Sequence, residues 1–153
     1  AWREQRRVAW LLGVSGVATI ALAVTGGIAA LGDTLFPARS LAEGLAQDVS
    51  PTAHVLIQLR MWHPVAAVVV GAWLFGTVWT VRKMVPTAAT RALAWAFTGC
   101  FLAQLGLGVL NVWLLAPVWL QLAHLLVADT IWVVLVFFAA AALSKEGEAG
   151  KAA

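Results

Sequence analysis

The stretch LIQLRMWHPVAAVVVGAWLFG, residues 56–76, decides the fold, because it is apolar enough to cross a bilayer yet contains polar groups. Arg60 and His63 are three residues apart, so they share one face of a helix, and Pro64 follows directly. Isolated cations and imidazoles are costly in hydrocarbon, so both residues need a partner. Pro64 frees the carbonyl of Arg60 and predicts a bend in the helix that aims His63.

The whole chain is as apolar as this stretch. Of its 153 residues, 62% are hydrophobic and 11% are charged, which indicates an integral membrane protein and excludes an ordinary soluble domain. The net charge of +3 comes from short basic flanks of apolar runs, so we expect no nucleic-acid partner. The one cysteine, Cys100, cannot form a disulfide within the chain. Because the sequence begins with Ala1, we expect trimming or a longer parent chain.

Four apolar runs are long enough for transmembrane helices, which need about 20 residues. They cover residues 8–31, 51–81, 92–115 and 118–143. This pattern predicts an all-α integral membrane protein, a four-transmembrane-helix bundle that forms a single domain over residues 1–153.

The connection between the first two runs is the longest. Within it, Leu41 and Leu45 are four residues apart, which predicts a short polar helix on the membrane surface, with a plain loop as the alternative. At the end of this connection, Ser50 and Pro51 are a favoured pair for the N-cap and first residue of the second transmembrane helix.

Lysine and arginine are distributed unevenly around the four runs. The long first connection contains only Arg39. The positive-inside rule therefore predicts that both termini are cytoplasmic and that this connection faces outward. Eight basic residues flank the runs on the predicted inner side: Arg3, Arg6, Arg7, Arg82, Lys83, Arg91, Lys145 and Lys151.

Glycines recur in the first and third runs. Small residues allow close contact between membrane helices, although glycine is also simply frequent in such helices. The residues expected to make these contacts are Gly13, Gly16, Gly26, Gly27, Gly106 and Gly108.

Two histidines on different helices are predicted to lie at similar depth. His63 is twelve residues past Pro51, or about 18 Å along the second helix, whose first turns should protrude from the membrane. His124 is six residues past Val118, or about 9 Å along the fourth helix. Both imidazoles therefore fall in the outer leaflet, where facing imidazoles of a bundle can hold an iron porphyrin from both sides.

Other interpretations of these polar groups remain open. A histidine in a span is also typical of a hydrogen-bonded packing residue or a member of a proton path. Arg60, one turn nearer the outside, is placed to meet a haem propionate or to pair with Asp129. Asp129 has Gln104 or Asn111 as alternative partners in a structural polar cluster.

At these residues the chain resembles the haem A synthase family (Cox15/CtaA) over nearly its whole length. Four motifs, one on each predicted helix, carry the resemblance: TGGIAALGDTLFP (25–37), LRMWHP (59–64), LAQLGLGVLNV (102–112) and LQLAHLLVADT (120–130).

Members of that family usually have eight spans in two similar halves, each with a histidine pair that corresponds to His63 and His124 here. The resemblance implies an oxidoreductase that converts a methyl group of haem O to the formyl group of haem A. One half then holds haem b and the other holds the substrate haem. It also implies a multi-pass protein of the prokaryotic plasma membrane, in a pathway with haem O synthase and the terminal oxidase.

Two positions differ from the catalytic-type half of the family. In many members a Glu stands three residues before the first histidine and an Arg directly after it, where this chain has Arg60 and Pro64. Residues 32–51 also lack the cysteine pair of many bacterial members. The chain therefore resembles the C-terminal, cofactor-binding half, with His63 and His124 as axial ligands of the haem iron and Arg60 as a third cofactor-binding residue.

The resemblance leaves the activity of the chain open. A homodimer or a second half is expected to complete a synthase, with a quinone or another electron donor. The alternatives are a bis-histidine membrane cytochrome b without enzymatic activity, or an assembly subunit that carries haem.

Overall fold

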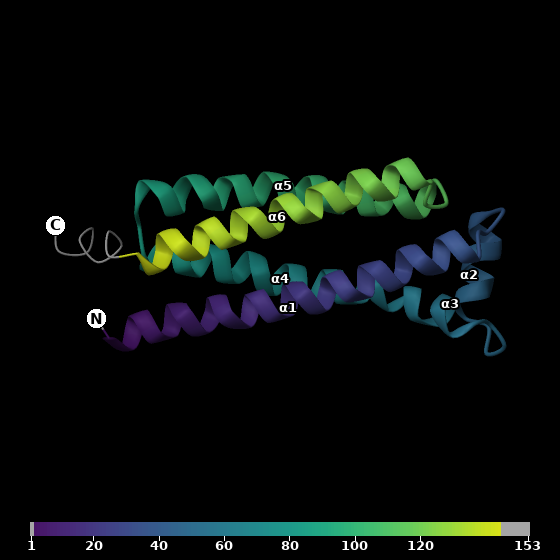
Figure 1. Ribbon diagram of the computed structural model, residues 1–153, viewed down its shortest axis with the longest axis horizontal. Coiled ribbons are helices and arrows are strands. Elements are labelled where there is room, and N and C mark those ends of the chain that lie inside the picture. The colour runs from purple at the N-terminus through teal and green to yellow at the C-terminus, as the bar shows by residue number, and fades with distance from the viewer. Residues whose placement is uncertain (1, 145–153) are drawn as a thin grey trace.

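The computed structural model describes residues 2–144, so Lys145 and Lys151 of the orientation argument lie outside the described residues. Four helical segments are long and apolar enough to cross a membrane, which confirms the predicted all-α, four-span architecture (Figure 1). In chain order the helices are α1 (Trp2–Leu35), α2 (Leu41–Asp48), α3 (Val55–Arg60), α4 (Trp62–Met84), α5 (Ala88–Trp113) and α6 (Val118–Leu143).

The short helix predicted in the first connection is confirmed as α2. Ser40 is its N-cap, and the Ser40 hydroxyl accepts a hydrogen bond from the Glu43 amide at 3.1 Å. Helix α5 begins at Ala88, four residues earlier than predicted, because Thr87 and Thr90 form a reciprocal capping box.

The predicted start of the second transmembrane helix is wrong. Ser50 does not cap it, because the Ser50 hydroxyl lies 3.1 Å from the Thr52 hydroxyl and a turn follows. The N-cap of α3 is His54, whose Nδ1 accepts a hydrogen bond from the Leu56 amide at 3.2 Å. His54 is exposed, and its ring packs on Phe36 at a centroid distance of 4.8 Å.

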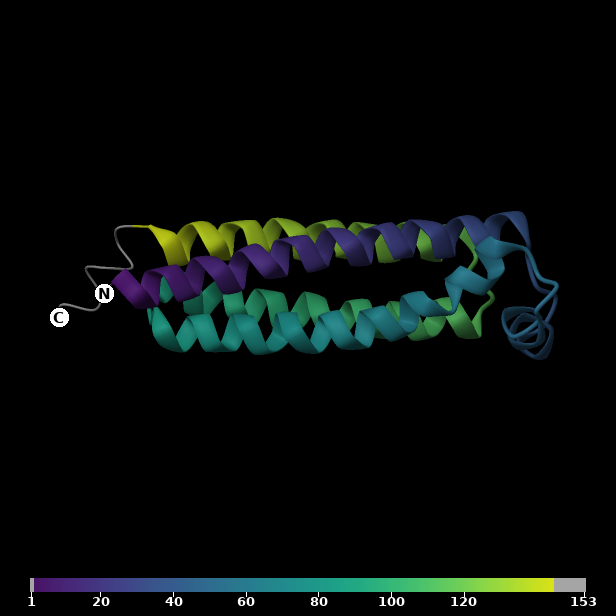
Figure 2. The ribbon, with the colours of Figure 1, turned by 90° about the horizontal axis from the view of Figure 1, so that it is seen from below.

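The predicted bend in the second span is present, and it lies between α3 and α4. The α-helix is interrupted at Met61, three residues before Pro64. Pro64 stands in the first turn of α4, where its missing N–H breaks no hydrogen bond of that helix. The change of direction between α3 and α4 is visible in Figure 2, and it places His63 directly after the bend.

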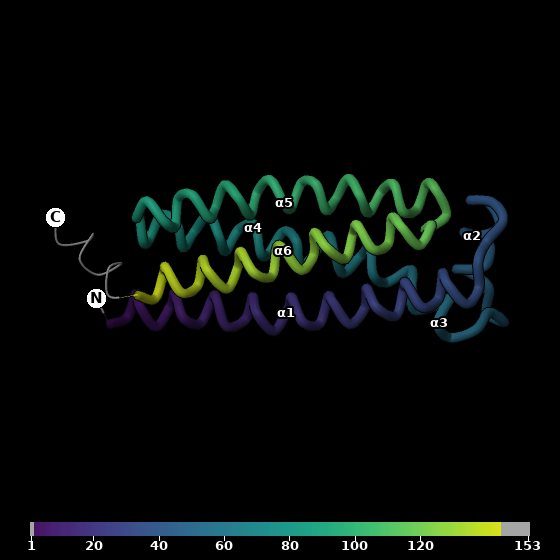
Figure 3. Tube along the Cα trace, turned by 45° about the horizontal axis from the view of Figure 1, so that its top comes forward, coloured from purple at the N-terminus to yellow at the C-terminus, as the bar shows by residue number. Residues whose placement is uncertain are grey.

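Two helix pairs build the bundle. Helices α5 and α6 form a closely packed hairpin, and α1 packs along both α4 and α3 (Figure 3). Contacts of α1 with α6 and of α4 with α5 join the two pairs. Helix α1 begins and α6 ends at one end of the bundle, which we call the termini end, while α2 covers the other, the α2 end (Figure 1).

The apolar core is concentrated toward the termini end. Among residues 2–144, only two apolar side chains near the α2 end, Ile57 and Leu120, are as fully buried as those of the core. Gly32 and the charged Arg60 are also buried in that half. The main core cluster consists of Val8, Leu74, Val78, Val81, Val85, Ala94, Phe97, Ile131, Leu135, Phe138 and Ala142, and the partly buried Cys100 packs against it.

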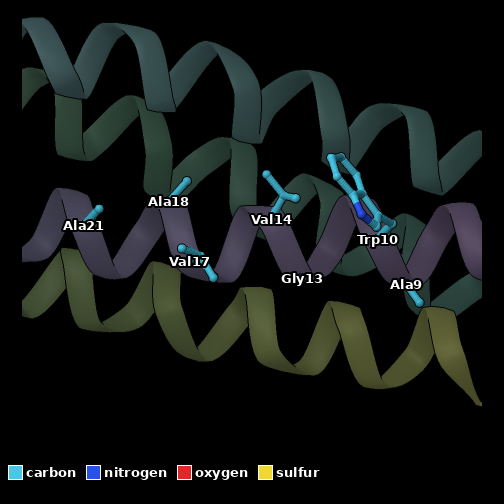
Figure 4. Close-up of a pocket in the computed structure, with 7 residues that line it drawn as sticks. All are labelled: Ala9, Trp10, Gly13, Val14, Val17, Ala18 and Ala21. Carbon is cyan, nitrogen blue, oxygen red and sulfur yellow. The ribbon is translucent and has the colours of Figure 1, made fainter.

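The prediction that the glycines make close helix contacts is wrong for four of the six. Within the described part of the chain, a Cβ added at Gly13, Gly16, Gly27 or Gly106 would meet no atom within 4 Å, because these positions face away from neighbouring helices. Gly13 instead lines an open apolar groove on the outside of α1, which contains neither span histidine (Figure 4).

Candidate functional site

His63 lies near the start of α4 and packs against α1. Its side chain is half-buried, and its Nδ1 lies 3.0 Å from the Thr25 hydroxyl oxygen. The next residue of α1, Gly26, faces the ring, since a Cβ there would come within 3.1 Å of His63 Cε1. The absence of a side chain at Gly26 therefore lets the imidazole lie directly on α1.

His124 has a similar arrangement on the other helix pair. It is half-buried on α6, and its Nε2 lies 3.1 Å from Gln104 Nε2 on α5. A Cβ at Gly108 of α5 would be 3.4 Å from His124 Cε1, which is van der Waals contact. Each imidazole thus rests against a glycine and a polar side chain of the helix with which its own helix pairs.

Both imidazoles lie in the half of the bundle nearer the α2 end. Helices α2 and α3 extend beyond the turn that joins α5 and α6 (Figure 1). Thr25, the contact of His63, lies about 15 Å before Leu35, the last residue of α1. His124 lies about 9 Å after Val118, the first residue of α6.

Three buried polar atoms on α5 and α6 have no hydrogen-bond partner within the described part of the chain. They are Gln104 Oε1, Asn111 Oδ1 and His124 Nδ1. Buried polar groups in native proteins almost always have a partner, and leaving one unpaired costs about 1–3 kcal/mol. Two of them, Gln104 Oε1 and His124 Nδ1, belong to side chains that contact each other, so this contact leaves buried polar atoms for a polar or coordinating group.

Arg60 is held by the outer connection. Its side chain is only 9% exposed, and it forms ion pairs with Asp48 (Nε to Oδ1, 2.6 Å) and Asp33 (Nη1 to Oδ1, 3.0 Å). Its Nη2 also donates to the Gly44 carbonyl at 3.2 Å and to Gln47 Oε1 at 3.4 Å. Arg60 thereby ties the end of α1 and helix α2 to α3, and a contact with a haem propionate stays a prediction.

The predicted partners of Asp129 are wrong. Asp129 is exposed on the outward side of α6, and no ion pair or hydrogen bond joins it to Arg60, Gln104 or Asn111 among the residues that the structure describes. Asp129 is five positions past His124, a spacing that turns its side chain toward a different side of the helix.

Sequence reasoning missed the residues that support the imidazoles. Thr25 was overlooked because its hydroxyl can bond its own helix, and it does so with the Leu22 carbonyl at 2.8 Å. Gly26 and Gly108 were noted only as helix-contact residues. Their presence in the quoted family motifs was the one signal that could have found them.

Fold and site together define a four-span membrane protein with two imidazoles in its interior. Residues 1–136 match the COX15-CtaA family, whose description is cytochrome oxidase assembly protein. The chain belongs to this family, the haem A synthase family.

Two relatives, from two strains of Thermus thermophilus, are similar over nearly the whole chain. Both are named protoheme IX farnesyltransferase, and they are 39% and 38% identical to this chain over 156 residues. The match covers 98% of this chain and 26% of each relative, so the chain spans about a quarter of their length. No solved structure matches the chain.

Proposed function

We propose that this chain is a membrane haem protein of the haem A synthase type. It binds haem b between His63 and His124 and takes part in oxidising the methyl group of haem O to the formyl group of haem A. The observation that carries this proposal is the pair of half-buried imidazoles on α4 and α6, each lying against a glycine of the neighbouring helix. Family membership supports a role in haem metabolism.

The residues present fit a haem. His63 and His124 would supply two nitrogen ligands, and a haem held in this way would favour electron transfer. Gly26 and Gly108 leave room for the two imidazoles to lie against α1 and α5. Unpaired atoms such as Gln104 Oε1 offer polar contacts beside the site. Arg60 stands one turn before His63 and is the proposed partner of a propionate, which would compete with its ion pairs to Asp33 and Asp48.

A complete synthase needs a second haem site, because one histidine pair holds one haem. In this proposal residues 1–153 form a single haem-binding domain, and a second copy or another family half provides the other site, with a quinone or a similar electron donor. Both termini face the cytoplasm of a prokaryotic cell, in its plasma membrane. Protoheme farnesyl transfer, in the name of the relatives, supports a pathway shared with haem O synthase and a terminal oxidase.

A bis-histidine cytochrome b is the second candidate. It is favoured because neither Arg60 nor Pro64 offers a free polar group beside His63. Arg60 is engaged in ion pairs, and Pro64 has no polar side chain. Such a protein would pass electrons to a partner without changing a haem substituent.

Identification of the bound porphyrins tests the proposal. The purified protein is extracted with acidified solvent, and each porphyrin is separated by chromatography and identified by its mass. Haem b together with haem O or haem A is the expected result for a synthase. Haem b alone, at one per chain, would favour the cytochrome, and a chain that neither contains haem nor binds added haemin would refute both.

Gly26→Ala is expected to weaken haem binding several-fold. The new Cβ would lie 3.1 Å from His63 Cε1, so the imidazole must move by a few tenths of an ångström away from its ligand position. Haem titration of the variant measures the loss. The matched control is Gly27→Ala, where a Cβ meets nothing within 4 Å of the described structure, and equal affinities of the two variants would contradict the prediction.

A further inference from the structure

The two imidazoles are held through different nitrogens. His63 is bonded through Nδ1, to Thr25, whereas His124 is bonded through Nε2, to Gln104. A flat porphyrin reaches an imidazole through Nε2, because Nδ1 adjoins the ring carbon that carries the side chain, so a hydrogen bond at Nε2 competes with the iron and a hydrogen bond at Nδ1 does not. The two sides of the site therefore differ in how ready they are for ligation.

The hydrogen bonds of Thr25 decide the tautomer of His63. A hydroxyl has one proton, and the Thr25 hydroxyl lies 2.8 Å from the Leu22 carbonyl, which can only accept. Thr25 therefore donates to Leu22 and accepts at its 3.0 Å contact with His63 Nδ1. Nδ1 must carry the hydrogen, so the lone pair of His63 is on Nε2, and no hydrogen bond engages it within the described residues.

On the other side, the Gln104 amide engages His124 Nε2 at 3.1 Å. The oxygen and nitrogen of the amide are interchangeable assignments, so Gln104 either donates to Nε2 or accepts from it. In both cases, ligation through Nε2 of His124 must replace an existing hydrogen bond, and the unpaired Nδ1 of His124 adjoins the ring carbon that carries the side chain, where a porphyrin does not fit. Ligation through Nε2 of His63 replaces none.

We propose that the two axial ligands are unequal, an inference that rests on the proposed haem site. Thr25 is a positioning residue that keeps the lone pair of His63 on Nε2, so His63 would be the permanent ligand. Gln104 competes with the iron for Nε2 of His124, so His124 is the ligand that exchanges. A small external ligand such as carbon monoxide then enters on the His124 side.

The first test replaces Thr25 by the isosteric valine. Loss of the Nδ1–H acceptor is expected to weaken haem binding about tenfold and to raise the reduction potential of the haem, because the imidazole becomes a weaker donor. Thr25→Ser should restore both values. The control is Thr19→Val, which removes a similar bond within α1, from the Thr19 hydroxyl to the Ser15 carbonyl at 2.8 Å, but touches no imidazole.

The second test replaces Gln104 by leucine and follows carbon monoxide binding to the reduced protein by stopped-flow absorbance. Carbon monoxide can bind only when one imidazole has left the iron. Without Gln104, the His124 ring that has left the iron loses its hydrogen-bond partner and returns to the iron more readily. The rate of carbon monoxide binding is therefore expected to fall several-fold, whereas Thr25→Val should not slow it.

These measurements separate this inference from the proposed function. Suppose that the wild-type protein binds haem. If Thr25→Val then has the same haem affinity and reduction potential, or Gln104→Leu has the same rate of carbon monoxide binding, the inequality of the ligands is refuted while the haem site stands. A wild-type chain that binds no haem would overturn both.

Discussion

Replacing either His63 or His124 by alanine is expected to abolish tight haem binding. Each substitution removes one of the two proposed nitrogen ligands and leaves a methyl group that cannot coordinate iron. Because both side chains are only half-buried and neither belongs to the main core cluster, the helices should still form. Haem content per chain, from the absorbance of the pyridine complex of the extracted haem, measures the loss.

His54→Ala is the matched control for both variants. His54 is the third histidine of the chain, but it is exposed at the start of α3, where it caps the helix and packs on Phe36. This variant should keep the haem content of the wild-type protein. Normal haem content in His63→Ala or His124→Ala, with unchanged helix content by circular dichroism, would remove that residue as a ligand.

Arg60→Met is expected to destabilise the fold by roughly 2–3 kcal/mol even without haem. Removing the guanidinium leaves Asp33 and Asp48 as neighbouring negative charges without their counterion. Those carboxylates are 32% and 20% exposed, so the cost should be smaller than for a fully buried pair. Thermal unfolding in detergent, followed by circular dichroism, measures the change.

Two further variants test the reason for this loss. The triple variant Arg60→Met, Asp33→Asn, Asp48→Asn should recover part of the stability, because it removes the repelling charges with the cation. Arg39→Met changes an exposed arginine of the same connection and should have little effect. If Arg60→Met reduced haem content without changing the stability of the haem-free protein, the contact with a propionate would be its main role.

Much of the architecture could be predicted from the sequence. Residues 118–143 were predicted as a span and form α6 with the same bounds, because hydrophobicity adds up residue by residue along the chain. The bend near Pro64 was also predictable from local chemistry, since proline cannot donate the hydrogen bond to the Arg60 carbonyl that one continuous helix would need. His63 and His124 were visible as candidates because imidazoles are rare inside spans.

The start of the second span depended on competing local bonds. Ser50 had the right residue type for an N-cap, but its hydroxyl pairs with Thr52, and His54 caps α3 instead. Several residues in this region can cap a helix, and only their positions in three dimensions decide which one does.

What the sequence determined by itself is the membrane class, the four spans and the two span histidines. The tertiary structure alone decided that Thr25 meets His63 across 38 positions of the chain, that Arg60 pairs with Asp33 and Asp48, and that Asp129 faces outward. The physical reason is that such contacts depend on the rotation of each helix about its axis and on its height beside its neighbours. Packing of the whole bundle sets both, and the composition of one segment does not contain them.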